Sequence, residues 1–269
     1  MRMLRITSLV IAACLACTFR VEAKVPQVDG IAHVAFRVSD LDGARAFYRG
    51  LGFEEAFAFT SGEKITQVFF KINDRQFIEL YPRVDETQPL GLMHVCFETD
   101  AAEALNARLV ERGLSPAPVK KGGAGNFVFS LTDPTGRTVE VTQYLPGSRH
   151  TEDRGKHLGA HRIANELREV RITAPDLSAA GRFYVAGLGL EKQKGKARLR
   201  MRVSRAVDQR IEIEPANTAG MPQIVFRASN VNRAAARLKK LGLTVTRHGR
   251  TVQVTDPDGN IFVFQKRRT

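Results

Sequence analysis

The sequence has few cysteines, and their positions leave no pair for a disulfide in the main part of the chain. Of three cysteines among 269 residues, Cys14 and Cys17 lie near the amino terminus and Cys96 is alone. If the first 23 residues are removed on export, the remaining chain carries no intramolecular disulfide even in an oxidising compartment. Its stability must then come from packed cores, for which 43% hydrophobic residues are sufficient.

The sequence also lacks a nucleic-acid-binding signature, despite a formal net charge of +13. No aromatic-rich RNA-binding motif and no helix-turn-helix pattern accompanies the 41 lysines and arginines, which are scattered along the predicted helices and turns. We interpret this excess as solvated surface charge and expect no nucleic-acid partner.

No apolar run is long enough for a membrane span, and the longest one lies near the start. Arg2 and Arg5 precede an apolar run over residues 6–19, and residues 21–23 resemble a signal-peptidase site. This pattern predicts a signal peptide over residues 1–23 and an exported protein, periplasmic or extracellular. Alternatively, residues 11–14 form a lipobox and Cys14 carries a lipid that anchors the chain to a membrane. An uncleaved anchor is a third reading.

One unit recurs four times from residue 31 onward. Residues 31–82 read as a strand, a helix and three strands, and residues 91–145 repeat this βαβββ pattern. Residues 146–165 are polar and basic, which predicts a linker. Two further copies follow in residues 166–269, where DPDGNIFVF matches DPTGRTVEV of the second unit. The repeat predicts an α+β fold with two homologous halves.

The repeated motifs carry a family resemblance. HVAFRV, a turn at Asp40 and ARAFYRGLGF resemble the opening of the vicinal oxygen chelate superfamily, and GLMHVCFE and DPTGRTVEV fit as well. That superfamily includes glyoxalase I, fosfomycin-resistance proteins, bleomycin-binding proteins and extradiol dioxygenases. The resemblance implies two tandem cup-shaped domains of two units each: residues 27–145 with a metal site, and residues 166–269 as a degenerate copy.

Histidines and glutamates share one face of the predicted strands in the first half. Because side chains alternate along a strand, His33 and His94 face away from the apolar side of the first strand in their units. Glu79 and Glu140 lie on the last strand of each unit. Two imidazoles and one or two carboxylates are a usual ligand set for a divalent ion such as Fe, Mn, Ni or Zn. We therefore expect one such ion per chain.

The resemblance adds roles to these residues. His33, His94 and Glu140 match the family's commonest metal triad, and Glu79 occupies the position of a fourth ligand or catalytic base in glyoxalase I. In a glyoxalase-like reaction, Glu79 or Glu140 would move a proton between adjacent carbons.

Four further residues are candidates for binding the substrate. Arg37 is expected to face the cup, where it either pairs with Glu79 or holds an anionic group, with a salt bridge at the rim as the structural alternative. We expect Phe77, Tyr81 and Tyr144 to line an apolar wall, although packing alone also explains them.

The second half lacks the ligand set. Its positions equivalent to His33, Glu79, His94 and Glu140 hold Glu169, Glu212, Gln223 and Val263. Since valine cannot bind a metal, this half is expected to be metal-free and to act as a structural partner, a lid or a separate ligand pocket. An alternative pairs the second unit with the third, which would gather His94, Glu140, Glu169 and Glu212 and leave His33 outside.

The other histidines and the single cysteine are weaker candidates. His150, His157 and His161 lie in the linker, where a solvated turn explains them, and His248 lies in a predicted hairpin. Cys96 reads as a small core residue without a base partner.

Three functions are compatible with the sequence: a glyoxalase-like isomerase or lyase acting on a small substrate with vicinal oxygens, an extradiol Fe(II) dioxygenase, and an exported protein that binds a small ligand without catalysis, such as a resistance protein. Against the dioxygenase, those enzymes usually have the active metal site in the second half. They also carry a His and a Tyr ahead of the last ligand, where this chain has Lys121-Gly122-Gly123 and Ser130.

Overall fold

A computed structural model of the chain describes residues 25–195, 197–216 and 221–266. The predicted signal peptide, including Cys14 and Cys17, lies outside these residues. Within the described part of the chain, no helix combines the length and the apolar character needed to cross a membrane.

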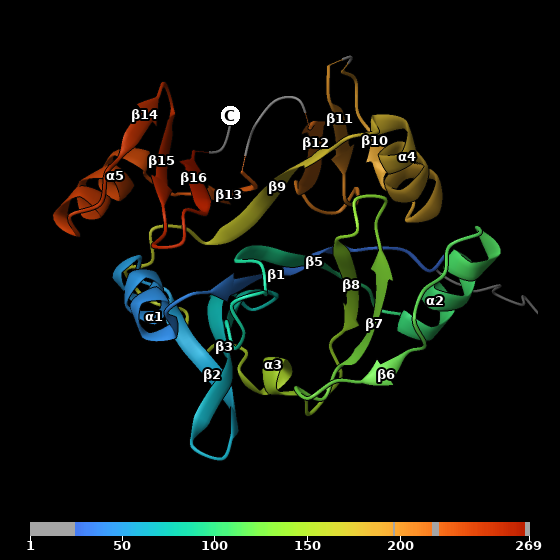
Figure 1. Cartoon of the computed structure of the whole chain (residues 1–269), viewed down its shortest axis with the longest axis horizontal. Helices are drawn as coiled ribbons and strands as arrows, with labels where there is room; N and C mark the ends of the chain where they lie inside the picture. The colour runs from blue at the N-terminus through green and yellow to red at the C-terminus, as the bar shows by residue number, and fades with distance from the viewer. Residues whose placement is uncertain (1–24, 196, 217–220, 267–269) are drawn as a thin grey trace, which may run out of the picture.

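Each half of the chain forms one curved eight-stranded sheet (Figure 1). In the first sheet the strand order is β2-β3-β4-β1-β5-β8-β7-β6. Its strands are β1 (Gly30–Val38), β2 (Glu54–Ser61), β3 (Lys64–Asn73), β4 (Gln76–Pro82), β5 (Gly91–Glu98), β6 (Lys120–Lys121), β7 (Phe127–Thr132) and β8 (Thr138–Gln143), and its helices are α1 (Leu41–Gly50) and α2 (Ala102–Glu111).

The second sheet has the same order, β10-β11-β12-β9-β13-β16-β15-β14. Its elements are β9 (Glu166–Ala174), α4 (Leu177–Gly181), the π-helix η1 (Arg182–Gly187), β10 (Glu191–Lys192), β11 (Leu199–Arg202), β12 (Arg210–Pro215), β13 (Gln223–Arg227), α5 (Val231–Lys240), β14 (Thr246–His248), β15 (Thr251–Thr255) and β16 (Ile261–Gln265). The predicted α+β fold with two tandem cups is confirmed.

The two units of the first half pair with each other. β1 is parallel to β4 and antiparallel to β5, and β5 is parallel to β8. This pairing contradicts the alternative in which the second unit pairs with the third, and it places His33 in the same sheet as His94 and Glu140.

The first helical segment of the second half is one residue longer than its counterpart in the first half. Asp40 caps α1 by accepting from the backbone N–H of Asp42, and the helix ends before Gly52, which has a φ of +84°. In the copy, four residues separate Tyr184 from Gly189, whereas three separate Tyr48 from Gly52. The structure absorbs the extra residue in the π-helix η1, whose wider turn holds one more residue than an α-helical turn.

Both halves share one continuous core of buried apolar residues. Tyr48 of α1 donates a hydrogen bond to Asp256 at 3.4 Å, and Tyr184 of η1 donates one to Asp133 at 2.9 Å. The Phe-Tyr motif of each half therefore meets the Asp-Pro turn of the other half. Figure 1 shows the result, with α1 beside α5 and α2 beside α4.

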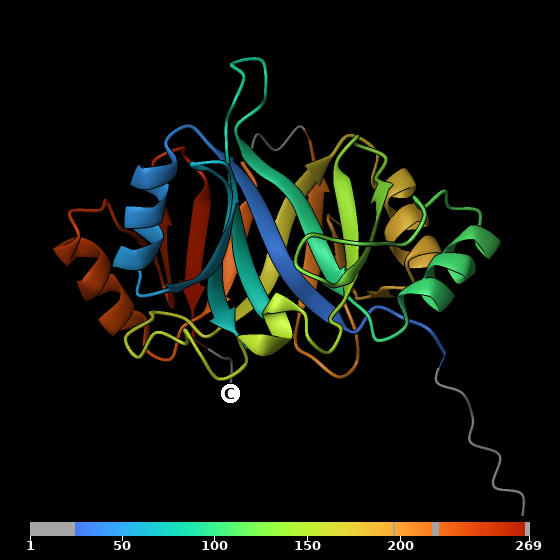
Figure 2. The same ribbon diagram turned by 90° about the horizontal axis from the view of Figure 1, so that it is seen from below.

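The linker carries a short helix, α3 (Arg149–Glu152), on the open side of the first cup. Figures 1 and 2 show it on the side away from the second half. Just beyond α3, Asp153 lies 2.8 Å from the Nζ atom of Lys71 of β3, a lysine with no exposed surface, and Asp74 lies 2.9 Å from the same atom. The linker is therefore fixed to the cup by a buried ion pair.

Candidate metal centre

Three ligand-type side chains converge in the first cup from three neighbouring strands. The register pairs Ala35 of β1 with His94 of β5, and Cys96 of β5 with both His33 of β1 and Glu140 of β8. The Nε2 atom of His33 lies 3.1 Å from Nε2 of His94 and 3.2 Å from Oε2 of Glu140, and the His94 and Glu140 atoms are 3.6 Å apart. Among the described residues, this is the group of three whose donor atoms are close enough to share one ion.

This donor set fits a divalent metal ion. Two imidazole nitrogens and a carboxylate oxygen about 2.0–2.2 Å from a common ion would be separated by distances close to those found here. Both histidines are buried, at 4% and 9% exposure, so few water molecules compete for them. His33, His94 and Glu140 would hold the ion.

Glu79 of β4 is the fourth group at this centre. Its Oε1 lies 3.3 Å from Nε2 of His33, and its Oε2 accepts hydrogen bonds from Gln67 at 2.9 Å and from the Tyr81 hydroxyl at 3.1 Å. The side chain is only 3% exposed. One carboxylate oxygen is thus fixed by the protein, while the other faces the triad.

The pKa values of the four groups differ because their neighbours differ. Burial and, to a smaller extent, the charge of His33 lower the pKa of His94 to about 4, against the attraction of Glu140. Burial also acts to lower the pKa of His33, but Glu79 and Glu140 outweigh it, so that pKa is raised. Burial raises the pKa of Glu79 to about 7, against the attraction of His33. Burial also acts to raise the pKa of Glu140, but the two imidazoles outweigh this effect, so the pKa of Glu140 is lowered.

A cavity of about 130 Å³ adjoins the centre, with room for roughly four water molecules. His33, Glu79, Glu140, Tyr81 and Tyr144 line it. Tyr81 and Tyr144, two of the predicted substrate-binding residues, thus both line this cavity.

Phe77 and Arg37 do not line this cavity. Phe77 is fully buried and packs edge-on against His150, with ring centroids 4.6 Å apart. It is therefore a core residue. Arg37 donates to the carbonyl of Pro89 at 3.2 Å, and its predicted pairing with Glu79 does not occur among the described contacts. It lines, together with His94, a separate depression of about 350 Å³.

The prediction that His150 lies in a solvated turn is wrong. The side chain is 4% exposed, stacks on Tyr144 with centroids 4.9 Å apart and lines the cavity of the centre. Its Nδ1 lies 2.7 Å from the side-chain nitrogen of Asn126, and its Nε2 has no hydrogen-bond partner among the described residues. Burial lowers the pKa of His150 to about 3, so this imidazole is neutral. A single histidine in a polar linker gave no periodic signal that could have indicated its burial.

Cys96 and the other linker histidines agree with their predicted roles. Cys96 is fully buried between the strands, and burial raises its thiol pKa well above the ordinary value. His157 is about two-fifths exposed beside Asp153, and His161 is exposed.

An arginine lies at the corresponding place in the second cup. Arg171 of β9, which takes the place of Ala35, has its Nε atom 2.5 Å from Glu169 and 4.0 Å from Glu212, and its Nη1 donates to Gln223 at 3.0 Å. Those three residues are the equivalents of His33, Glu79 and His94. Val263, the equivalent of Glu140, is buried. A guanidinium therefore supplies positive charge at the place equivalent to the predicted ion.

We expect metal affinity in the first cup to fall with decreasing pH, because the ligands bind only when deprotonated. Because the pKa of His33 is raised, protons begin to compete with the metal for this ring at a pH above the usual pKa of histidine. The lowered pKa of His94 keeps that ring neutral. Calorimetric titration with Mn²⁺ should show about tenfold weaker binding per pH unit once the pH is below the pKa of His33. Affinity that does not change between about pH 8 and pH 5.5 would contradict this assignment.

Comparison with known proteins gives matches to both halves at the level of the fold. Residues 30–141 match the model of the Glyoxalase/Bleomycin resistance protein/Dioxygenase superfamily. No curated protein matches the chain. Among solved structures, the Mn(II)-bound glyoxalase from Novosphingobium aromaticivorans is 20% identical with a TM-score of 0.68, over 90% of this chain and 83% of that one.

Two dioxygenase structures are equally similar. The 2,3-dioxygenase LapB from Pseudomonas sp. KL28 is 19% identical with a TM-score of 0.71, over 91% of this chain and 94% of that one. A variant of homoprotocatechuate 2,3-dioxygenase from B. fuscum is 16% identical with a TM-score of 0.70, over 91% of this chain and 73% of that one. At these identities, the likeness shows the fold alone.

Proposed function

We propose that the chain is a divalent-metal-dependent, glyoxalase-like isomerase or lyase, since residues 30–141 match the model of the Glyoxalase/Bleomycin resistance protein/Dioxygenase superfamily. Its substrate would be a small molecule with vicinal oxygens. The observation that carries the proposal is the position of Glu79, a buried carboxylate held by Gln67 and Tyr81 at 3.3 Å from a ligand of the candidate metal centre.

The metal would be one Fe, Mn, Ni or Zn ion held by His33, His94 and Glu140. When bound, such an ion polarises the oxygens of a coordinated substrate and makes the adjacent carbon more acidic.

Glu79 is suited to move the proton. A pKa of about 7 lets this carboxylate accept a proton near neutral pH and return it to the neighbouring carbon. The hydrogen bonds from Gln67 and Tyr81 fix Oε2, so that Oε1 is the atom presented to the centre. Glu140 is the weaker base because the two imidazoles lower its pKa.

The small volume of the cavity beside the centre favours small substrates. His150 of the α3 helix contributes to the walls of the 130 Å³ cavity, together with residues 122–124 and 126. An anionic substituent has a partner in Arg37, which lines the adjoining depression beside His94.

Ring cleavage by an extradiol mechanism is the second candidate, and His150 is the observation that favours it. The sequence has no histidine just ahead of the last ligand, but the linker brings His150 to the same cavity, with Nε2 free of a partner among the described residues. Since the side-chain nitrogen of Asn126 donates to Nδ1, Nε2 carries the proton of this neutral imidazole and could donate a hydrogen bond to an oxygen of a bound catechol.

We predict that Glu79→Gln lowers kcat by about 10²–10⁴-fold while the metal content stays unchanged, because the amide keeps the shape of Glu79 but cannot accept the proton. The assay would follow conversion of the hemithioacetal formed from methylglyoxal and a thiol, and a parallel assay would follow ring cleavage of catechol in air. Glu212→Gln, which alters the equivalent carboxylate of the second cup, is the matched control and should retain parental activity.

The results separate the candidates. If the parent protein converts the hemithioacetal, and Glu79→Gln loses this turnover while Glu212→Gln keeps it, the isomerase or lyase is supported. If the parent protein converts catechol but not the hemithioacetal, the dioxygenase is supported. A parent protein that binds metal but converts neither compound would act as a binding protein, and a fully active Glu79→Gln variant would exclude Glu79 as the base.

A further inference from the structure

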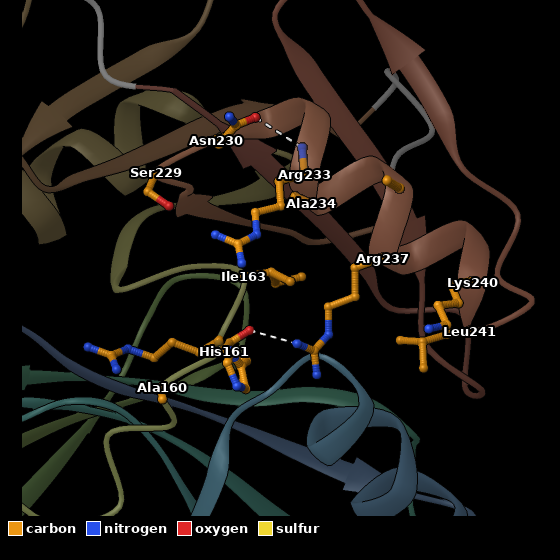
Figure 3. A pocket seen from close by; sticks show the side chains of 12 residues that line it. Ala160, His161, Ile163, Ser229, Asn230, Arg233, Ala234, Arg237, Lys240 and Leu241 are labelled. Atoms are coloured by element: carbon orange, nitrogen blue, oxygen red, sulfur yellow. Dashed lines mark hydrogen bonds between the residues drawn. The ribbon is translucent and has the colours of Figure 1, made fainter.

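A second cavity, of about 660 Å³, lies between the linker and helix α5 (Figure 3). Linker residues 160–163 form one wall and α5 with the two residues before it forms the other. Its size is within the range of small-molecule sites in proteins. It shares no lining residue with the cavity of the metal centre.

The lining of this cavity is strongly basic. Arg162, Arg233, Arg237 and Lys240 line it, and no acidic residue does. Within residues 25–195, 197–216 and 221–266, none of these four cations forms an ion pair with a carboxylate. Their charge is therefore available to a ligand.

Arg237 is already held in position. Its Nε donates to the carbonyl of Gly50 at 2.9 Å and its Nη1 donates to the carbonyl of His161 at 2.8 Å, so it joins α5 to the end of α1 and to the linker. Figure 3 shows this side chain extending from α5 toward His161, with Arg233 extending toward Ile163. The Nη2 atom of Arg237 has no acceptor among the described residues and can bind a ligand oxygen.

The repeat shows that two of these cations are not required by the fold. Arg233, Arg237 and Lys240 are spaced at i, i+4 and i+7, so they share one face of α5 although like charges at this spacing destabilise a helix. In the equivalent helix α2, the positions of Arg233 and Lys240 hold Ala104 and Glu111. A helix of this unit folds with a small or an acidic residue at these places.

The cavity also has an apolar side. Ile163, Ala234 and Leu241 line it, and Leu241 is 44% exposed. A ligand that satisfies both sides has a strongly anionic group and a small apolar body.

We propose that this cavity binds a small organic phosphate monoester, with the phosphate held by Arg233, Arg237 and Lys240 and the organic part against Ile163 and Leu241. Two negative charges and three acceptor oxygens match several cations better than a single carboxylate does. The site is independent of the function proposed for the metal centre.

The test is calorimetric titration of the metal-loaded protein with phenyl phosphate. We expect saturable binding of one molecule per chain, about tenfold weaker in Arg233→Ala and in Lys240→Glu, since each variant loses a charge-assisted contact. Lys239→Glu is the matched control, because it makes the same charge change at an exposed neighbour on α5 outside the cavity and should bind like the parent. Binding should persist in the His94→Ala variant, which separates this cavity from the metal centre.

Other outcomes overturn the proposal. Absence of saturable binding, or equal losses in Lys239→Glu and Lys240→Glu, would leave only general attraction to a basic protein. Loss of binding in His94→Ala would assign the phosphate to the metal. Tighter binding of succinate than of phenyl phosphate would exclude a phosphate monoester, and equal affinity for inorganic phosphate would exclude the apolar contact.

Discussion

We expect the parent protein to bind about one divalent ion per chain and the His94→Ala variant to retain little of it. Removing His94 takes away one of three donors, and the remaining Nε2 of His33 and Oε2 of Glu140, 3.2 Å apart, cannot complete the set. Loss of a group that only supports a ligand costs about 10–100-fold in affinity, so loss of a ligand should cost at least as much. Elemental analysis of the purified protein by mass spectrometry measures this directly.

Gln223→Ala is the matched control for His94→Ala. Gln223 occupies the position of His94 in the second cup, where it accepts a hydrogen bond from Arg171, so its loss should not change the metal content. Unchanged metal in His94→Ala would remove the proposed site. The identity of the metal is also informative: iron in the parent protein favours the dioxygenase, whereas nickel, zinc or manganese favours the isomerase or lyase.

The second large effect concerns stability. Asp153→Ala should lower the free energy of unfolding by about 3 kcal/mol, because it leaves the buried ammonium group of Lys71 without its buried partner. This is the lower end of the usual range, since Asp74 still lies 2.9 Å from Lys71. Urea unfolding followed by circular dichroism measures the change.

The partner variant Asp74→Ala provides the comparison for Asp153→Ala. The Asp74 side chain is 44% exposed, so its loss should cost less than about 1 kcal/mol. Equal effects of the two variants would show that burial does not decide the strength of these pairs. A loss below about 1 kcal/mol in Asp153→Ala would show that the linker is not fixed by Lys71.

The repeat and the alternation of side chains predicted the architecture and the common face of the candidate metal ligands. Strand parity could do this because His33, His94 and Glu140 lie on adjacent strands of one sheet, so facing the same way also brings them together. The same argument was insufficient for Phe77, which shares the face of Glu79 but lies under His150.

Contacts made by irregular segments could not be predicted. The burial of His150 depends on where the linker returns across the cup, and no periodic pattern in residues 146–165 encodes that path. Arg171 was missed for another reason. Its counterpart in the first half is Ala35, which has no functional group, so comparing ligand positions between the halves did not draw attention to it.

The guanidinium of Arg171 makes the two cups respond differently to their surroundings. Its positive charge is covalently part of the chain, so no chelator can extract it, and no change of metal supply can replace it with another ion. Acidification does not remove it either. In a medium depleted of metal, the second cup therefore keeps the positive charge of Arg171 beside Glu169. The shared core and the Tyr48 and Tyr184 contacts join this half to the first cup, so part of the support of the candidate metal centre does not depend on a bound ion.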